Sequence, residues 1–143
     1  MLYIASDHAG YPLKEKIKIY LVKQKVKFVD LGTDSIESVD AQDFAIKTVK
    51  KVKAQTSNRG ILICQSGIMM SVVANRFNGI RAALTWDPAI AKQGREHSDI
   101  NILVLAGVIA SPKNWQKIVI TFLKTKTLTK AKYLRRIKKL DSI

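Results

Sequence analysis

Cysteine and histidine are scarce in this chain, and each shortage excludes a kind of protein. Cys64 is the only cysteine, so no internal disulfide can form, and a disulfide-stapled secreted domain is excluded. A reducing compartment is the simple interpretation. The only two histidines, His8 and His97, do not have the spacing of zinc ligands, and we therefore expect no metal site.

Long apolar runs are also absent. The longest, residues 102–110, is far shorter than the roughly 20 residues that a membrane-spanning helix needs. Residues 1–5 have no basic flank and are followed by Ser6 and Asp7, which is not the pattern of a signal peptide. A chain of 143 residues can bury a core unaided, so we expect a single domain, residues 1–143, in the cytoplasm.

Acidic residues are missing from one stretch of the sequence. The net charge is +14, and between Asp99 and Asp141 there are ten Lys or Arg residues and no Asp or Glu. Such a stretch could bind nucleic acid or another anionic surface. No helix-turn-helix signature, zinc spacing or aromatic-interleaved motif accompanies the charge. We therefore favour a lysine-rich solvated surface, part of which can serve an anionic small substrate.

What the chain does have is a regular alternation of short apolar runs and helix-like segments. The apolar runs predict strands at residues 2–6, 26–30, 60–64, 80–84 and 101–106. Amphipathic or capped segments predict helices at residues 12–25, 44–54, 68–77, 88 to 94–96, 112–123 and 131–140. Five strands alternating with helices predict an α/β fold, a three-layer Rossmann-like sandwich with a five-stranded parallel sheet.

The central strand–turn–helix–strand unit, residues 60–84, places Cys64 at the carboxyl end of a buried strand. In such a unit the turn after the first strand, here Gln65 to Gly67, lies at a helix amino terminus and carries the chemistry. The helix dipole and nearby N–H groups favour the thiolate, which could act as a nucleophile or a general base. The alternative for a lone cysteine is a small buried hydrophobe.

Two further polar segments are predicted to lie near Cys64. Asp7 and His8 follow the first strand, and right-handed crossovers bring the carboxyl ends of all strands to one edge of the sheet. His97 is expected in a polar loop just before the last strand. Taken singly, Asp7 could be only a helix cap, and His97 could be an exposed side chain without a function. Their convergence with Cys64 on one edge predicts a functional site.

Several motifs follow one another in an order and spacing that match a known family. They are Ser6-Asp7-His8-Ala9-Gly10, Leu13-Lys14, Asp30-Leu31-Gly32-Thr33, Glu37-Ser38-Val39-Asp40, Gly60-Ile61-Leu62-Ile63-Cys64, Ala74-Asn75-Arg76, Gly79-Ile80-Arg81-Ala82-Ala83, Arg95-Glu96-His97 and Asn101-Ile102-Leu103. On these motifs the chain resembles the type B ribose-5-phosphate isomerase family, which includes the galactose-6-phosphate isomerase subunits. The resemblance spans nearly the whole length.

The resemblance implies an aldose–ketose isomerase that interconverts ribose 5-phosphate and ribulose 5-phosphate through a cis-enediol(ate), with neither metal nor cofactor. It also implies that Cys64 is the base between C1 and C2, that Ser66 hydrogen-bonds the reacting oxygens, and that His97 helps to open the sugar ring. Asp7 would hold substrate hydroxyl groups. Family members are dimers or tetramers with sites shared between subunits, so the helix at 131–140 is expected at a subunit interface of a homo-oligomer.

The resemblance assigns anion-binding groups as well. His8 and Arg136 would bind the phosphate of the sugar phosphate, and Lys132 stands where the family usually has arginine. An anion hole for the enediolate would come from consecutive backbone N–H groups, those of Gly67, Ile68, Met69, Met70 and Ser71.

Some positions depart from the family pattern. Gln65 and Met69 replace glycines of the loop Cys-Gly-Thr-Gly-Ile-Gly, Ser98 replaces an asparagine, and Val108 replaces an arginine. Glycine suits a loop with positive φ that approaches a substrate closely, so we expect Gln65 and Met69 to have reshaped the anion hole and weakened activity on ribose 5-phosphate. Three alternatives stay open: a divergent isomerase, an isomerase of galactose 6-phosphate or another sugar phosphate, and a non-catalytic basic subunit on the same scaffold.

Overall fold

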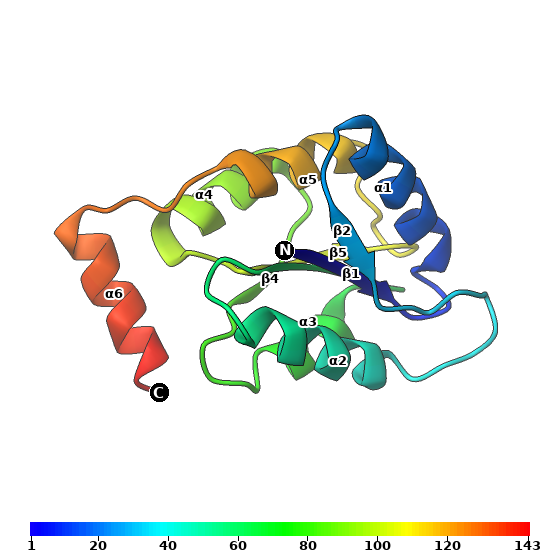
Figure 1. The fold of residues 1–143 in the computed structure, drawn as a ribbon, viewed down its shortest axis with the longest axis horizontal. Coiled ribbons are helices and arrows are strands. Elements are labelled where there is room, and N and C mark those ends of the chain that lie inside the picture. Colours follow the sequence, from blue (N-terminus) through cyan, green and yellow to red (C-terminus); the bar gives the residue numbers. More distant parts are fainter.

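Five short strands form one sheet at the centre of the computed structural model, which describes residues 1–143 (Figure 1). They are β1 (Leu2–Ser6), β2 (Phe28–Asp30), β3 (Arg59–Cys64), β4 (Ala82–Leu84) and β5 (Ile102–Ala106). Their order across the sheet is β2–β1–β3–β5–β4, and every neighbouring pair is parallel. The predicted five-stranded parallel sheet is confirmed.

Helices cover both faces of the sheet and give the predicted three layers (Figure 1). One face is covered by α1 (Tyr11–Lys23), α4 (Pro88–Ser98) and α5 (Trp115–Lys124), and the other by α2 (Ala41–Lys53) and α3 (Ile68–Ala74). The last helix, α6 (Ala131–Asp141), stands apart from both layers at one end of the molecule. None of the six helices combines the length and apolar character that crossing a membrane requires.

Alternation along the central strands divides the core into two clusters. In β3, Ile61 and Ile63 face the layer of α1, α4 and α5, whereas Leu62 and Cys64 face α2 and α3. The alternation follows from the two-residue period of a strand. Because both faces are covered, β5 is buried at every position and β3 at every position except Arg59, as continuous apolar runs predict.

Several helix ends differ from the sequence prediction, among them the end of α3, which stops at Ala74 rather than at residue 77. Helix α2 begins at Ala41 rather than at residue 44, because Ala41 is itself buried in the core. Helix α5 begins at Trp115 rather than at residue 112, because residues 113–114 form a turn. Helix α4 continues to Ser98 instead of stopping at residues 94–96, and it ends where Asp99 takes a left-handed conformation with φ 46°. This later end of α4 places His97 in the helix rather than in a loop.

Candidate active site

Cys64 ends β3 in the middle of the sheet, and its thiol is almost completely buried. The residue is 3% exposed, and the Gly67 N–H donates a hydrogen bond to Cys64 Sγ at 3.1 Å. Strand β1 flanks β3, with Ser6 opposite Ile63. Asp7, which follows β1, therefore lies near Cys64 at the carboxyl edge, the edge of the sheet at which the parallel strands end.

Gly67 fixes the geometry of the turn between β3 and α3. Its φ of 80° lies in the left-handed region that favours glycine. A Cβ there would overlap the side chain of Leu84 and lie 3.4 Å from the carbonyl of Leu105, so any side chain would strain the turn. The Gly107 N–H donates to the Cys64 carbonyl at 2.8 Å. Backbone geometry therefore holds the thiol beside the start of α3.

The five backbone N–H groups expected to form an anion hole are not equally free. Three already donate within the protein: Gly67 to Cys64 Sγ, Ile68 to Ser66 Oγ at 3.3 Å, and Ser71 to the Gly67 carbonyl at 3.1 Å. The N–H groups of Met69 and Met70 belong to the first turn of α3, where no intrahelical acceptor exists, and they have no other partner. The structure narrows the candidate anion hole to these two donors.

Asp7 and His8 are each held by the backbone at the carboxyl edge. Asp7 Oδ1 accepts a hydrogen bond from the Gly10 N–H at 2.8 Å, and Asp7 is 7% exposed. His8 Nδ1 accepts one from the Val39 N–H at 3.2 Å. Since Nδ1 is an acceptor, the neutral imidazole carries its proton on Nε2, and the ring orientation is fixed.

Gln65 and Met69 have not forced an unusual backbone on this turn. Neither residue has a positive φ, and both side chains are exposed, Met69 to 44%. The expectation that these positions need positive φ is therefore wrong, because Met69 has entered a regular helix. The Gln65 carbonyl instead accepts the N–H of Val108 at 3.0 Å, which ties the turn to the chain after β5.

An apolar cavity of about 270 Å³ opens beside Ser66 at the carboxyl edge. Trp86, the second residue after β4, is part of its wall and is 62% exposed. Trp86 was not predicted as a site residue, although a tryptophan that follows a predicted strand at this edge is a local signal. Its neighbours in the wall are Ile68, Leu84, Thr85, Ala106, Ile109 and Ala110.

His97 lies at the opposite edge of the sheet from Cys64. Helix α4 follows the carboxyl end of β4 and returns to the start of β5, so its last turn reaches the amino edge, where the strands begin. Two expectations are therefore wrong: His97 is in a helix and not in a loop, and it does not join Asp7 and Cys64 on one edge of its own chain. The first is wrong because α4 continues two residues beyond the predicted stop. The second is wrong because each helix between parallel strands returns the chain to the amino edge, so residues just before β5 lie there.

Lys132 and Arg136 share the amino edge with His97. Tyr133 of α6 stacks on His97, with ring centroids 4.5 Å apart and 13° between the ring planes. Lys132 Nζ lies 4.9 Å and Arg136 Cζ 6.0 Å from the centroid of the Tyr133 ring. One tyrosine, which was not predicted as a site residue, thus brings the candidate ring-opening histidine and both candidate phosphate-binding cations together.

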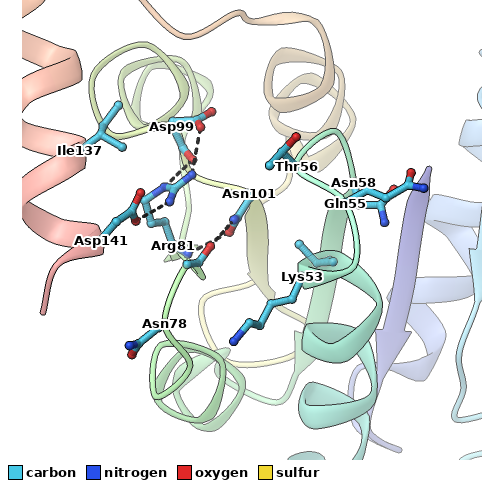
Figure 2. A pocket seen from close by; sticks show the side chains of 12 residues that line it. Lys53, Gln55, Thr56, Asn58, Asn78, Arg81, Asp99, Asn101, Ile137 and Asp141 are labelled. Atoms are coloured by element: carbon cyan, nitrogen blue, oxygen red, sulfur yellow. Dashed lines mark hydrogen bonds and ion pairs between the residues drawn. The ribbon is translucent and has the colours of Figure 1, made fainter.

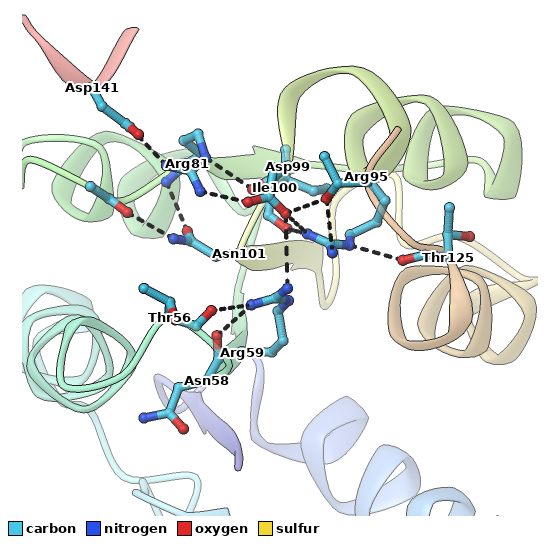
Figure 3. A network of polar contacts seen from close by, with 12 residues as sticks. Thr56, Asn58, Arg59, Arg81, Arg95, Asp99, Ile100, Asn101, Thr125 and Asp141 are labelled. Carbon is cyan, nitrogen blue, oxygen red and sulfur yellow. Dashed lines mark hydrogen bonds and ion pairs between the residues drawn. The ribbon is translucent and has the colours of Figure 1, made fainter. Parts of the chain in front are cut away.

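A polar network around Asp99 stabilises this amino edge (Figure 3). The Asp99 carboxylate accepts hydrogen bonds from Arg95 at 2.6 Å, Thr127 at 2.6 Å and Arg81 at 2.9 Å. Burial by itself raises the pKa of Asp99, but the hydrogen bonds from Thr127 and Arg95 outweigh it, so the pKa lies below its ordinary value. The network was not predicted; the four-residue spacing of Arg95 and Asp99 was its only signal.

A polar cavity of about 380 Å³ adjoins the network, between α6 and the starts of the central strands (Figure 2). Arg81 Nη1 pairs with Asp141 Oδ1 at 2.8 Å, and the Arg81 N–H donates to Asn101 Oδ1 at 2.8 Å. The lining side chains thus bind one another and tie the end of α6 to the sheet. No group of three His, Cys, Asp or Glu side chains lies close enough together to hold a metal ion.

The fold and the sequence of this chain are similar to those of known isomerases. A ribose 5-phosphate isomerase of Thermotoga maritima has a solved structure with a TM-score of 0.93 and 44% identity, over 99% of this chain and 97% of that one. The type B ribose 5-phosphate isomerase of Trypanosoma brucei gives a TM-score of 0.92 and 34% identity, over 99% and 96%. Ribose-5-phosphate isomerase B of Escherichia coli is 39% identical over 97 residues, 68% of this chain and 65% of that one.

The family model described as Ribose/Galactose Isomerase matches residues 2–140, which is almost the whole chain. The matched length includes the carboxyl-edge turn after β3, the end of α4 and nearly all of α6. This chain therefore belongs to the Ribose/Galactose Isomerase family of enzymes.

Proposed function

We propose that this protein is an aldose–ketose isomerase that interconverts ribose 5-phosphate and ribulose 5-phosphate. The observation that carries the proposal is the Cys64 thiol, buried at the end of a central strand beside the free N–H groups of Met69 and Met70. Proton transfer next to a carbonyl needs a base and oxyanion donors at one place. The relatives in Thermotoga maritima and Trypanosoma brucei, both ribose 5-phosphate isomerases by name, support this substrate.

The reaction moves one proton between neighbouring carbons. The Cys64 thiolate takes the proton from C2 of the open-chain aldose, and the freed electron pair forms the C1=C2 double bond while the C1 oxygen becomes negative. The hydroxyl proton on the C2 oxygen passes to the C1 oxygen beside Ser66. The thiol then returns its proton to C1, and C2 becomes the ketone. The intermediate is a cis-enediol(ate), and because no electron leaves the sugar, the step needs no redox cofactor. In this mechanism the backbone N–H donors stabilise the negative oxygen, which is the task that a metal would otherwise perform.

The placement of the candidate residues supports a homodimer, or a tetramer built from such dimers. Within one chain Cys64 is at the carboxyl edge and His97 at the amino edge, so a site that needs both must take one from each of two copies. A two-fold axis that brings unlike edges together makes two such sites. Apolar side chains of α6 and α3 are available for the contact, since Leu134 is 47% and Val72 52% exposed.

Each shared site would then hold the substrate from two sides. From the carboxyl edge of one subunit, Asp7 would bind hydroxyl groups and His8 the phosphate. From the amino edge of the other, His97 would open the sugar ring while Lys132 and Arg136 bind the phosphate. Arginine and lysine suit this task because their hydrogen bonds to phosphate are charge-assisted. In this role the basic charge of α6 serves the substrate rather than nucleic acid.

The chain would act as a single sugar-phosphate isomerase domain, residues 1–143, with α6 at the subunit interface. A single free, buried cysteine supports a location in the reducing cytoplasm. The family description also names galactose, so galactose 6-phosphate is the second candidate substrate. A non-catalytic basic subunit on this scaffold would retain the fold without turnover.

One coupled assay on the purified protein tests the proposal. Ribulose 5-phosphate formed from ribose 5-phosphate is measured with wild type and Cys64→Ala, in parallel with galactose 6-phosphate as substrate. We expect turnover of ribose 5-phosphate that depends on Cys64. Turnover of galactose 6-phosphate alone would assign the second substrate, and no turnover of either in a folded protein would support the non-catalytic subunit.

A further inference from the structure

Helix α6 touches the rest of the chain chiefly through one aromatic side chain. Tyr133 is the only buried residue of α6, and its buried ring face lies against the imidazole of His97. The charged residues of the helix, including Lys132 and Arg136, are exposed. The stack is therefore the main packing contact between α6 and α4.

The two ends of α6 are fixed independently of this stack. Before the helix, the Leu128 N–H donates to the Glu96 carbonyl at 3.0 Å, and the Thr127 hydroxyl donates to Asp99 at 2.6 Å. At its end, Asp141 pairs with Arg81. With both ends held, the face of α6 that carries Tyr133 is turned toward His97, and replacing the ring should loosen the imidazole without releasing the helix.

We propose that Tyr133 is a positioning residue that fixes the imidazole plane of His97. This rests on the role of His97 in ring opening proposed above. The nitrogens of imidazole donate and accept in the ring plane, so a proton is transferred well only when that plane points at the sugar oxygen. A stack against one face leaves both nitrogens free and hinders rotation of the ring. The same tyrosine ring lies under Lys132 and Arg136, so it also sets the position of the imidazole relative to those cations.

The experiment combines kinetics with proton NMR of the histidines. The chain has only two histidines, so the imidazole Cε1–H region holds two resonances, and His8→Gln assigns them. Protons over the face of an aromatic ring are shifted upfield. In Tyr133→Leu we expect the His97 resonance to move downfield and kcat to fall about tenfold to a hundredfold, the size of effect that misplacing a catalytic group produces. Tyr133→Phe keeps a ring and should restore both the shift and kcat.

Two controls separate positioning from a general effect on α6. Lys138→Ala, on the exposed side of the same helix, should leave both readouts unchanged. A merely structural role of Tyr133 would raise KM through Lys132 and Arg136 as much as it lowers kcat, whereas positioning of His97 lowers mainly kcat. Should Tyr133→Leu release α6 in circular dichroism, Tyr133→Met fills the space with a flexible chain and no ring current, and it is measured in its place.

Three outcomes would overturn the proposal. They are an unshifted His97 resonance in the wild type, a downfield shift in Tyr133→Leu with unchanged kcat, and a Tyr133→Phe variant as poor as the leucine variant. The proposed function has its own check. If His97→Ala keeps full kcat, the ring-opening role itself is wrong; if His97→Ala is impaired and Tyr133→Leu is not, only the positioning role is wrong.

Discussion

The two edges of the sheet place their functional groups by different means. At the carboxyl edge the backbone positions Cys64. Gly67 has positive φ, and the N–H groups of Gly67 and Gly107 donate hydrogen bonds to the thiol and to the carbonyl of Cys64. At the amino edge side chains position the functional groups, through the Asp99 network and the stack of Tyr133 on His97. A group held by backbone is rigid and intolerant of added atoms, whereas a group held by side chains changes with substitution and pH. We therefore expect substitutions and changes of pH to affect the two halves of the proposed site in different ways.

The largest effect should come from removing the base at the carboxyl edge. Cys64→Ala deletes the thiol and leaves the Gly67 turn in place, so we expect kcat to fall by about 10²–10⁴-fold, the usual contribution of a general base. Stability should change little, because the surrounding hydrogen bonds of the backbone remain. The coupled assay and a thermal melt measure the two quantities. Full activity in the variant would mean that Cys64 is only a small buried hydrophobe.

A mixing experiment tests whether the two edges meet between subunits. Cys64→Ala and His97→Ala are each expected to be nearly inactive, and they are unfolded and refolded together in equal amounts. Half of the dimers are then hybrids, and one of the two sites in each hybrid has both residues intact, so about a quarter of wild-type activity should return. No recovery, with hybrids detected by mass spectrometry, would contradict the shared site.

Removing one phosphate ligand at the amino edge should have a smaller effect, on substrate binding. A charge-assisted hydrogen bond contributes about 1.5 kcal/mol, so Arg136→Ala should raise KM for ribose 5-phosphate about tenfold and change kcat little. Lys138→Ala is the matched control for loss of one positive charge on α6. Tight binding of generic duplex DNA, with log affinity falling linearly in log salt, would instead favour a nucleic-acid role for this helix.

The side-chain network should make the amino edge sensitive to acid. The pKa of Asp99 is lowered in the folded protein, so its contribution to stability is complete above its ordinary pKa of 3.8 and is lost as the pH falls through the folded value. Asp99→Asn should lower Tm at pH 7 by several degrees, since one or two charged hydrogen bonds are lost, each worth about 1.5–3 kcal/mol.

The difference in Tm between wild type and Asp99→Asn should begin to shrink as the pH is lowered below 3.8, because the Asp99 carboxyl then binds a proton in the unfolded chain before it does so in the folded protein. Melting curves from pH 7 to pH 3 measure it. A constant difference across this range would show that the charge of Asp99 does not stabilise the fold. Asp40→Asn, at the start of α2, where its side chain makes no capping bond, is the control for removing one carboxylate.

The sequence predicted the sheet and the carboxyl edge better than the amino edge. Apolar runs such as residues 102–106 identify buried strands directly, and parallel strands place Asp7 and Cys64 together by topology alone. The edge on which His97 lies also follows from topology, because a residue just before a parallel strand lies where the strands begin. Whether His97 is in a helix or in a loop depended on where α4 stops. That end is determined by the left-handed Asp99 and its long-range partners Arg81 and Thr127, which local patterns do not reveal. The contact between Tyr133 and His97 is likewise tertiary and has no local signal.

The smallest effect is expected where the sequence had suggested a large one. Gln65 and Met69 stand at glycine positions of the family loop, yet both have ordinary φ and exposed side chains, and the Met69 N–H is free. Gln65→Gly with Met69→Gly should therefore leave kcat on ribose 5-phosphate unchanged. It should lower the free energy of unfolding by about 1 kcal/mol, because glycine is unfavourable in the first turn of α3. Gly67→Ala is the contrasting variant: it adds a Cβ that would overlap Leu84, so it should lose activity. A rise in kcat for the double variant would show instead that the two side chains obstruct the oxyanion donors. Side chains, and not the backbone alone, would then determine the activity of the carboxyl edge.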